Sequence, residues 1–184
     1  MVKKLKAFTL IELVVVIVIL GILAVTAAPR FLSYQRDAHI ARADTAFADF
    51  QAAAHFYHSK WLVEGEPAPT ETVDYGQGDI YPSLVGYPIS VDQPPYEDAT
   101  GIRGSDCVAL WDALIDTDLT IRSQMSTGYV LPSHTDIVSW YTGSNECYYY
   151  YTTSYSSTEQ LPILYYEPIT GEMRTTEENP STTP

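Results

Sequence analysis

Residues Ala7–Phe31 read AFTLIELVVVIVILGILAVTAAPRF, and this stretch decides how the chain is organised. From Phe8 to Ala28 the residues are apolar except for three, Thr9, Glu12 and Thr26. As an α-helix this run is roughly 30 Å long, which is enough to cross the hydrocarbon core of a bilayer. The sequence therefore predicts a membrane-spanning helix close to the N-terminus.

The positive charges around the apolar run predict its orientation in the membrane. Three lysines, Lys3, Lys4 and Lys6, precede the run, and no cation follows it before Arg30. Lys and Arg are enriched on the cytoplasmic side of membrane spans. We therefore expect a cytoplasmic N-terminus, with everything after Arg30 exported.

The carboxylate of Glu12 is the unexpected feature of the run, because a charge inside hydrocarbon costs a few kcal/mol or more. A carboxylate at this position indicates a partner group that offsets the cost of its charge. An ordinary signal peptide is one alternative, but it would place Glu12 in its apolar region and Pro29 directly after the cut. That alternative also needs an unusually long apolar region. A plain signal anchor is a second alternative, and it leaves Glu12 without a role.

The segment Ala7–Glu12, AFTLIE, resembles the cleavage and methylation motif of type IV prepilins. The longer segment Phe8–Leu32, FTLIELVVVIVILGILAVTAAPRFL, is especially similar to pilins of the mannose-sensitive haemagglutinin (MSHA) type. The resemblance implies that a prepilin peptidase cuts between Ala7 and Phe8, that the new Phe8 amine is methylated, and that the apolar helix is retained. The family usually has Gly before the cut, where this chain has the small residue Ala7.

The resemblance also implies a role for Glu12 in assembly. In a helix that starts at Phe8, the amine and the Glu12 carboxylate lie one turn apart on the same face. Glu12 of an incoming subunit would neutralise the Phe8 amine of a subunit already in the filament. Each buried charge is costly alone, and their attraction offsets much of that cost. Such a pair disfavours wrong registers between otherwise uniform apolar helices.

Two residues weaken the apolar helix. Gly21 is a poor helix former, and Pro29 removes a hydrogen bond to Val25. Membrane helices often tolerate both residue types. The resemblance implies a helix break in the filament, with the stretch from Gly21 to Pro29 bending or melting.

After Pro29 the helical pattern continues and becomes amphipathic. Apolar residues spaced by three and four predict one buried face that packs on a sheet: Ile40, Ala43, Phe47, Phe50, Ala54, Tyr57 and Trp61. Other faces are rich in alanine and allow neighbouring helices to approach closely: Ala38, Ala41, Ala46, Ala48, Ala52 and Ala53.

The remaining chain predicts a loop region followed by an antiparallel sheet. Residues 62–104 are rich in Pro, Gly and acidic residues, and they correspond to the variable loop of pilins. Ser105 is the expected N-cap of a short helix. Five runs read as strands of an antiparallel meander: 128–131, 136–141, 147–152, 161–166 and 172–174. The residues from Thr175 onward carry no apolar anchor, and we expect them to be loose.

We therefore expect an α+β type IV pilin fold, with a long N-terminal helix packed on a C-terminal antiparallel β-meander. The expected division of the chain is a removed basic leader (1–7), a transmembrane or filament-core helix (8–28), an amphipathic helix half (29–61), a variable loop region (62–104), a short helix with a disulfide-bounded sheet (105–175) and a tail (176–184).

The chain has two cysteines, Cys107 and Cys147, which predict a disulfide because the protein is expected to be exported. The chain-entropy model assigns about 4 kcal/mol to closing a loop of this length. A cysteine pair in the C-terminal part resembles the bridged loop of type IV pilins.

The formal net charge of −13 argues against a nucleic-acid partner, because the arginines form no basic stripe. His55 and His58 have a spacing compatible with metal ligation, but histidines on helices are usually surface or packing residues. Asp112, Asp116 and Asp118 match no calcium loop. The clustered tyrosines suit a sheet core about as well as a sugar-binding surface. We expect no cofactor, no metal and no enzymatic activity.

The sequence therefore indicates a structural subunit of an MSHA-like type IV pilus that forms helical homo-oligomeric filaments for adhesion. Its expected partners are the prepilin peptidase and methyltransferase, the inner-membrane assembly platform, and surface glycans. We expect a single-pass inner-membrane protein with a cytoplasmic N-terminus, which then enters an extracellular pilus. The alternatives are a type II secretion pseudopilin or minor pilin, and a membrane-anchored periplasmic binding or enzymatic domain.

Overall fold

The computed structural model describes residues 8–76, 78–96, 99–124, 130–141, 143 and 145–180. The chain divides into two compact units, one ending at His39 and the other starting at Ile40. The expected strand residues Gly128 and Tyr129 and the cleavage residue Ala7 lie outside the described residues.

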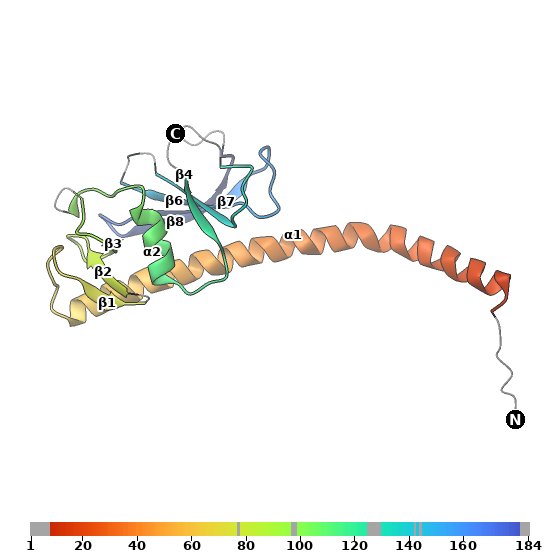
Figure 1. Cartoon of the computed structure of the whole chain (residues 1–184), viewed down its shortest axis with the longest axis horizontal. Coiled ribbons are helices and arrows are strands. Elements are labelled where there is room, and N and C mark those ends of the chain that lie inside the picture. Colours follow the sequence, from red (N-terminus) through yellow and green to blue (C-terminus); the bar gives the residue numbers. More distant parts are fainter. Residues whose placement is uncertain are drawn as a thin grey trace, which may run out of the picture. The chain divides into compact units, whose positions relative to one another are not determined.

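The N-terminal unit consists of the first part of helix α1 (Leu10–Val63), drawn from red to orange in Figure 1. Its large apolar side chains are exposed, among them Phe8 at 86% and Val25 at 77%. Within the described residues, α1 is the one helix long and apolar enough to cross a membrane. The predicted long apolar helix is confirmed.

Helix α1 continues through Gly21 and Pro29, so the expected break is absent from the single chain. The Thr26 hydroxyl donates a 2.9 Å hydrogen bond to the carbonyl oxygen of Leu23, which supplies a contact to the backbone before the proline. Pro29 cannot donate a backbone hydrogen bond to the Val25 carbonyl, but the loss of this one bond does not interrupt the helix. Opening of this segment in a filament stays a prediction.

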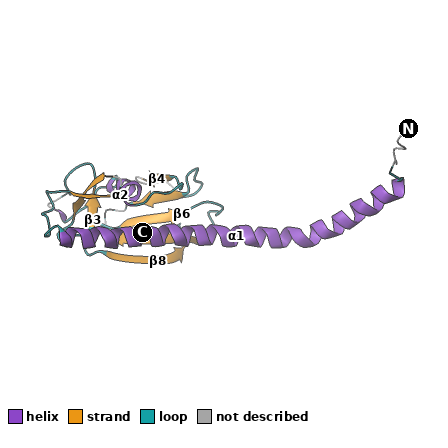
Figure 2. Ribbon diagram, turned by 90° about the horizontal axis from the view of Figure 1, so that it is seen from below, coloured by secondary structure: helices purple, strands orange, loops and turns teal. Residues whose placement is uncertain are grey.

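In the C-terminal unit, the remaining part of α1 buries the predicted aromatic face. Phe47, Phe50, Ala54, Tyr57 and Trp61 are all buried, whereas Ile40 at the start of the unit is only half-buried. Figures 1 and 2 show this part of α1 lying across the sheet that contains β6 and β8. The predicted packing of the helix on a sheet is confirmed.

Helix α1 ends in a Schellman motif around Gly65. The Glu66 N–H donates to the Trp61 carbonyl oxygen at 3.0 Å, and the Gly65 N–H donates to that of Leu62 at 3.2 Å. Gly65 has a φ of 88°, which glycine adopts without a Cβ penalty. The helix therefore stops two residues beyond Trp61, where the expected amphipathic half ends.

A small antiparallel sheet occupies part of the region that the sequence predicts to be a loop. It has the order β1 (Val73–Tyr75), β2 (Gly78–Pro82) and β3 (Pro88–Ser90). The interpretation of the whole of 62–104 as a loop was wrong, because three apolar residues, Val73, Ile80 and Ile89, are fully buried against the core. Prolines at the ends of these short strands hid that pattern.

The main sheet has five strands in the order β4 (Ile121–Gln124), β5 (Ile137–Trp140), β6 (Cys147–Tyr151), β7 (Leu161–Glu167) and β8 (Glu172–Glu178). Strands β5 to β8 form the predicted antiparallel meander, whereas β4 pairs with β5 in parallel. Val130 and Leu131 are buried but lie outside any strand, which corrects that assignment. Strand β8 extends four residues beyond Arg174, so residues 175–178 are paired and not loose.

Helix α2 (Asp106–Leu114) covers the same side of the main sheet as α1. Phe50 of α1 lies between three rings of this core: its centroid is 5.6 Å from Trp111 of α2, 5.1 Å from Tyr149 of β6 and 5.4 Å from Tyr166 of β7. Ser105 is the N-cap residue of α2, as predicted, but its side chain makes no cap hydrogen bond. Asp106 instead accepts a 2.7 Å hydrogen bond from the Arg103 N–H.

Candidate assembly site at the start of helix α1

The first turn of α1 is closed by reciprocal hydrogen bonds between Thr9 and Glu12. The backbone N–H of Thr9 donates to Glu12 Oε2 at 2.8 Å, and the Thr9 hydroxyl donates to the same oxygen at 2.7 Å. The Glu12 N–H lies 3.4 Å from the Thr9 hydroxyl oxygen, which accepts its hydrogen bond. This arrangement is a capping box, in which two side chains satisfy the free N–H groups at a helix start.

Sequence reasoning missed this local role of Glu12. The spacing Thr9-x-x-Glu12 before an apolar run is the sequence signature of a capping box, so the signal was present. The unusual charge in an apolar run instead favoured a partner group on another chain. The two roles are compatible, because within the described residues Glu12 Oε2 accepts both Thr9 bonds and Oε1 accepts none.

Phe8 is exposed and directly precedes the capping box. Its backbone nitrogen becomes the new terminal amine if the leader is removed. Both Phe8 and Glu12 belong to the N-terminal unit, and both are exposed.

In the C-terminal unit, the predicted disulfide is present. Cys107 of α2 and Cys147 of β6 are bonded, with their Cα atoms 5.6 Å apart, and both side chains are fully buried. The bridge closes a 40-residue sequence separation that contains α2, β4 and β5. It therefore ties the helix above the sheet to a central strand.

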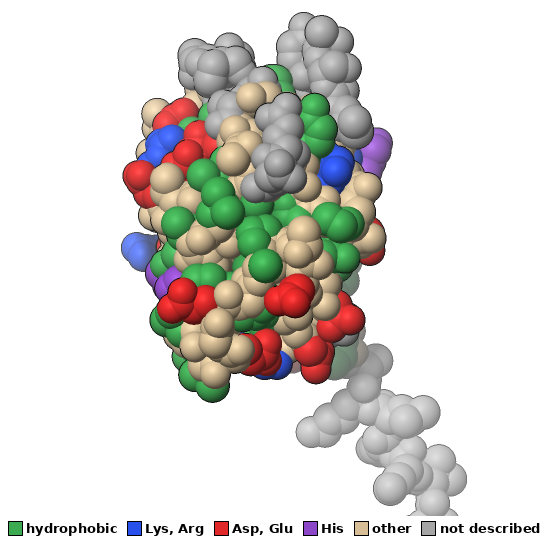
Figure 3. Space-filling model, turned by 90° about the vertical axis from the view of Figure 1, so that its left-hand side faces the viewer, with side chains coloured by type: hydrophobic (Ala, Val, Ile, Leu, Met, Phe, Trp, Pro, Cys, Tyr) green, Lys and Arg blue, Asp and Glu red, His purple; other side chains and the backbone are tan. Residues whose placement is uncertain are grey.

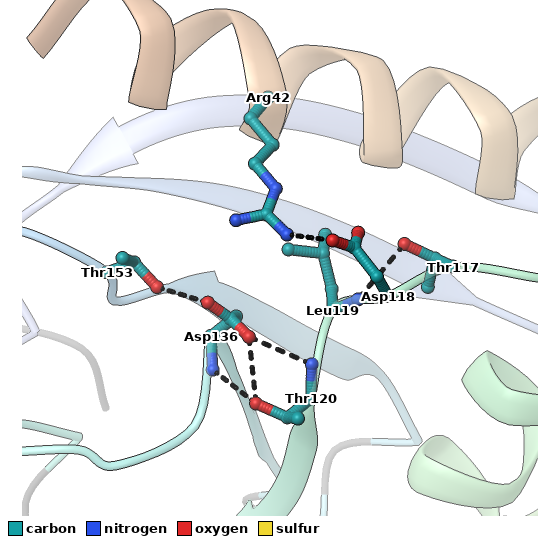
Figure 4. Close-up of polar contacts among 7 residues, drawn as sticks. All are labelled: Arg42, Thr117, Asp118, Leu119, Thr120, Asp136 and Thr153. Carbon is teal, nitrogen blue, oxygen red and sulfur yellow. Dashed lines mark hydrogen bonds and ion pairs between the residues drawn. The ribbon is translucent and has the colours of Figure 1, made fainter. Parts of the chain in front are cut away.

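A carboxylate, Asp136, joins three segments at one end of the main sheet (Figure 4). Its Oδ2 accepts hydrogen bonds from the N–H and hydroxyl of Thr120, at 3.0 and 2.8 Å, and its Oδ1 accepts one from the Thr153 hydroxyl at 2.6 Å. Partial burial alone would raise the pKa of Asp136, but these hydrogen bonds outweigh it, and the pKa lies below its ordinary value. Both oxygens of Asp136 therefore accept hydrogen bonds from other segments of the chain, which is a structural role.

The residues considered as metal ligands have other surroundings. The His58 ring stacks on Tyr87 with centroids 4.5 Å apart, and its Nδ1 donates to the Gly86 carbonyl oxygen at 3.2 Å. His55 meets the edge of the same Tyr87 ring. Asp112, Asp116 and Asp118 are exposed, and Asp118 is paired with Arg42 at 2.7 Å. In the described part of the chain, no group of three or more ligating side chains gathers.

Comparison with known proteins identifies the N-terminal segment. Residues 3–28 match the family model of the prokaryotic N-terminal methylation motif. The match covers the basic residues before Ala7, the capping box and the apolar run, and it supports a type IV pilin-like or pseudopilin-like prepilin. Such a motif implies processing by a prepilin peptidase, membrane anchoring and a structural role. No curated protein and no solved structure matches the chain.

Proposed function

We propose that this protein is a structural subunit of a type IV pilus of the MSHA type, polymerised through its N-terminal helix into adhesive surface filaments. The observation that carries the proposal is the methylation motif at residues 3–28, together with an apolar helix whose large side chains are exposed. Such a surface needs lipid before assembly and other copies of the helix afterwards. A filament supplies the second environment.

Maturation removes residues 1–7 and creates a methylated amine at Phe8. The subunit is held in the inner membrane, with its N-terminus in the cytoplasm, until the assembly platform extracts it. Removal of the leader also removes three lysines, Lys3, Lys4 and Lys6, so the exported protein is more acidic than the precursor.

Glu12 then acts in two ways. Its Oε2 holds the first turn of its own helix through Thr9, and its Oε1 accepts the Phe8 amine of a neighbouring subunit. The capping box supports this proposal, because it fixes the rotamer of the carboxylate before the partner arrives. Methylation keeps the positive charge of the amine, so the attraction survives it. The stretch from Gly21 to Pro29 is the proposed site where the helix opens as subunits pack.

A pseudopilin of a type II secretion system, or a minor pilin, is the second candidate, because it carries the same N-terminal motif. The Cys107–Cys147 bridge favours the pilin, since major pseudopilins commonly lack such a disulfide. The methylation motif and the buried aromatic core favour a pilin or a pseudopilin over a membrane-anchored periplasmic enzyme.

Filament yields of Glu12 variants test this function. Glu12→Gln keeps an oxygen that accepts the Thr9 hydrogen bonds but removes the charge. We expect it to stay in the membrane as monomer, with filaments lost from the sheared surface fraction. Thr9→Val is the matched control, because it weakens the cap and keeps the charge, and we expect it to assemble. Normal filament yield from Glu12→Gln would contradict the charge-pair mechanism.

A further inference from the structure

Arg30 is a cation without an intrachain partner in the described residues. It follows the apolar run directly and lies on the exposed surface of α1. Tyr34 lies one helical turn further along the same face and is 65% exposed. The cations of the C-terminal unit differ, because each of them contacts another group of the chain: Arg42, Lys60, Arg103, Arg122 and Arg174.

The C-terminal unit has a groove along α1 that could hold such a cation. Two adjoining hollows of about 330 and 340 Å³ share Ala46, Asp49 and Thr117 among their lining residues. One side of the groove is α1, and the other is the segment from the end of α2 to β4, together with Tyr75 of β1. Figure 4 shows Arg42 of α1 reaching Asp118, with Thr117 beside them, and all three residues line the first hollow.

The second hollow combines small apolar residues with unpaired charge. The small residues Ala46, Ala52 and Ala53 line its helix side, and Ala52 is exposed, so a neighbouring helix can approach closely. Asp49 on α1 and Asp116 on the facing segment make no hydrogen bond or ion pair within the described residues. Phe56 borders the same hollow and is 65% exposed. The groove therefore suits a helix that brings one cation and one aromatic ring.

The distribution of charge along the chain indicates which part of a second copy can bind in this acidic groove. From Ile40 onward the sequence has 21 Asp and Glu residues against five Lys and Arg residues, so two C-terminal units repel each other. Figure 3 shows red acidic side chains spread over the end of that unit, with few blue ones. Between Phe8 and His39 the charges balance, with Arg30 and Arg36 against Glu12 and Asp37.

We infer that the groove lined by Ala46, Asp49, Ala53, Phe56 and Asp116 receives the helix segment around Arg30 of a second copy. Arg30 pairs there with Asp49 and Asp116, and Tyr34 of the incoming helix packs near Phe56. The inference rests on the proposed function, since the contact forms only between subunits of a filament. It extends that function from the Glu12 pair to a second charged contact outside the apolar bundle.

A charge swap tests the contact in assembled filaments. We expect Arg30→Glu and Asp116→Arg each to lower filament yield by about tenfold or more, because losing one partner of a half-buried charge pair weakens association by at least that factor. The double variant, Arg30→Glu with Asp116→Arg, should restore the yield. Asp44→Arg is the matched control, because Asp44 lies on α1 outside the groove, and we expect normal assembly. Single variants that assemble normally, or a double variant without rescue, overturn the inference.

Cross-linking gives a second measurement that does not depend on a loss of assembly. Both native cysteines are in the buried disulfide, so only the introduced thiols react with a cross-linker. In wild-type-like filaments, Tyr34→Cys with Phe56→Cys should give cross-linked dimers with a short thiol cross-linker. Tyr34→Cys with Asp44→Cys should give none. Filaments that contain the first pair and yield no dimers overturn the inference.

These experiments separate the inference from the proposed function. If the wild-type chain forms no filaments in a host with a type IV assembly platform, the proposed function fails, and this inference fails with it. If filaments form and Glu12→Gln abolishes them, while the charge swap and the cross-link are both negative, the proposed function stands and only the groove contact fails.

Discussion

The hydroxyl of Tyr149 donates a 2.7 Å hydrogen bond to the backbone carbonyl oxygen of Cys107. Strand β6 is therefore joined to α2 twice, by this bond and by the disulfide to Cys147. Tyr149 is fully buried, and the loss of water around it raises its pKa well above the ordinary value. Its phenol consequently stays protonated and remains a donor at any physiological pH.

Replacing Tyr149 by Phe should destabilise the folded C-terminal unit by about 1–3 kcal/mol, because the Cys107 carbonyl is left buried without its donor. Tyr96→Phe is the matched control, since its half-exposed hydroxyl makes no hydrogen bond in the described structure, and its free energy of unfolding should not change. Urea unfolding of the detergent-solubilised chain, followed by tryptophan fluorescence, measures both. Equal stability of the two variants would show that the Tyr149 bond contributes nothing.

Removing the disulfide with Cys107→Ala and Cys147→Ala should lower the free energy of unfolding by about 4 kcal/mol on the chain-entropy model. The physical reason is that the unfolded chain regains the freedom of the 40-residue separation that the bridge closes. The same urea titration under non-reducing conditions measures the loss. A decrease below about 1 kcal/mol would contradict the entropic account.

Gly86 and Gly65 give a matched pair of backbone substitutions. Both have positive φ, 80° and 88°, so alanine at either should cost about 1 kcal/mol from the backbone alone. A Cβ at Gly65 meets open space, whereas one at Gly86 meets the buried ring of Trp61. We expect Gly86→Ala to lose a further ~2 kcal/mol through overpacking. Equal melting temperatures for the two variants would contradict this difference.

We expect the free energy of unfolding to decrease in acid because Asp136 becomes protonated. Its pKa is lower in the folded protein than the ordinary value of about 3.9, so its charged form stabilises the fold above that pH. The contribution is lost as the pH falls through the lowered folded value. Between about pH 5 and pH 3 the wild type should therefore lose more stability than Asp136→Asn, which does not titrate. Parallel unfolding curves for the two proteins over this range would contradict the prediction.

The parts of the fold that sequence reasoning found have strong periodic patterns. The apolar run and the aromatic face of α1 repeat at helical spacing, and β5 to β7 carry dense β-branched and aromatic residues. The missed parts lack such patterns. Strand β4 reads IRSQ, and the end of β8 reads TTEE on an exposed sheet edge, so partner strands and not apolar alternation define them.

The candidate sites show a similar limit. Glu12 was identified because its charge is unusual in an apolar run, and its capping role was readable from Thr9 three residues earlier. The groove beside α1 was not readable, because Asp49 and Asp116 are far apart in sequence and meet only through the fold. The alanines that line it were expected to allow close helix approach, but the sequence did not show which of them lie together.

The most direct test of the central claim is the intact mass and N-terminal peptide of this chain in sheared, purified surface filaments. We expect an abundant chain that begins at Phe8, carries one methyl group on its terminal amine, and retains the complete apolar helix. A filament-bound chain that begins at Met1 or Pro29, or filaments that lack this chain, would contradict the account.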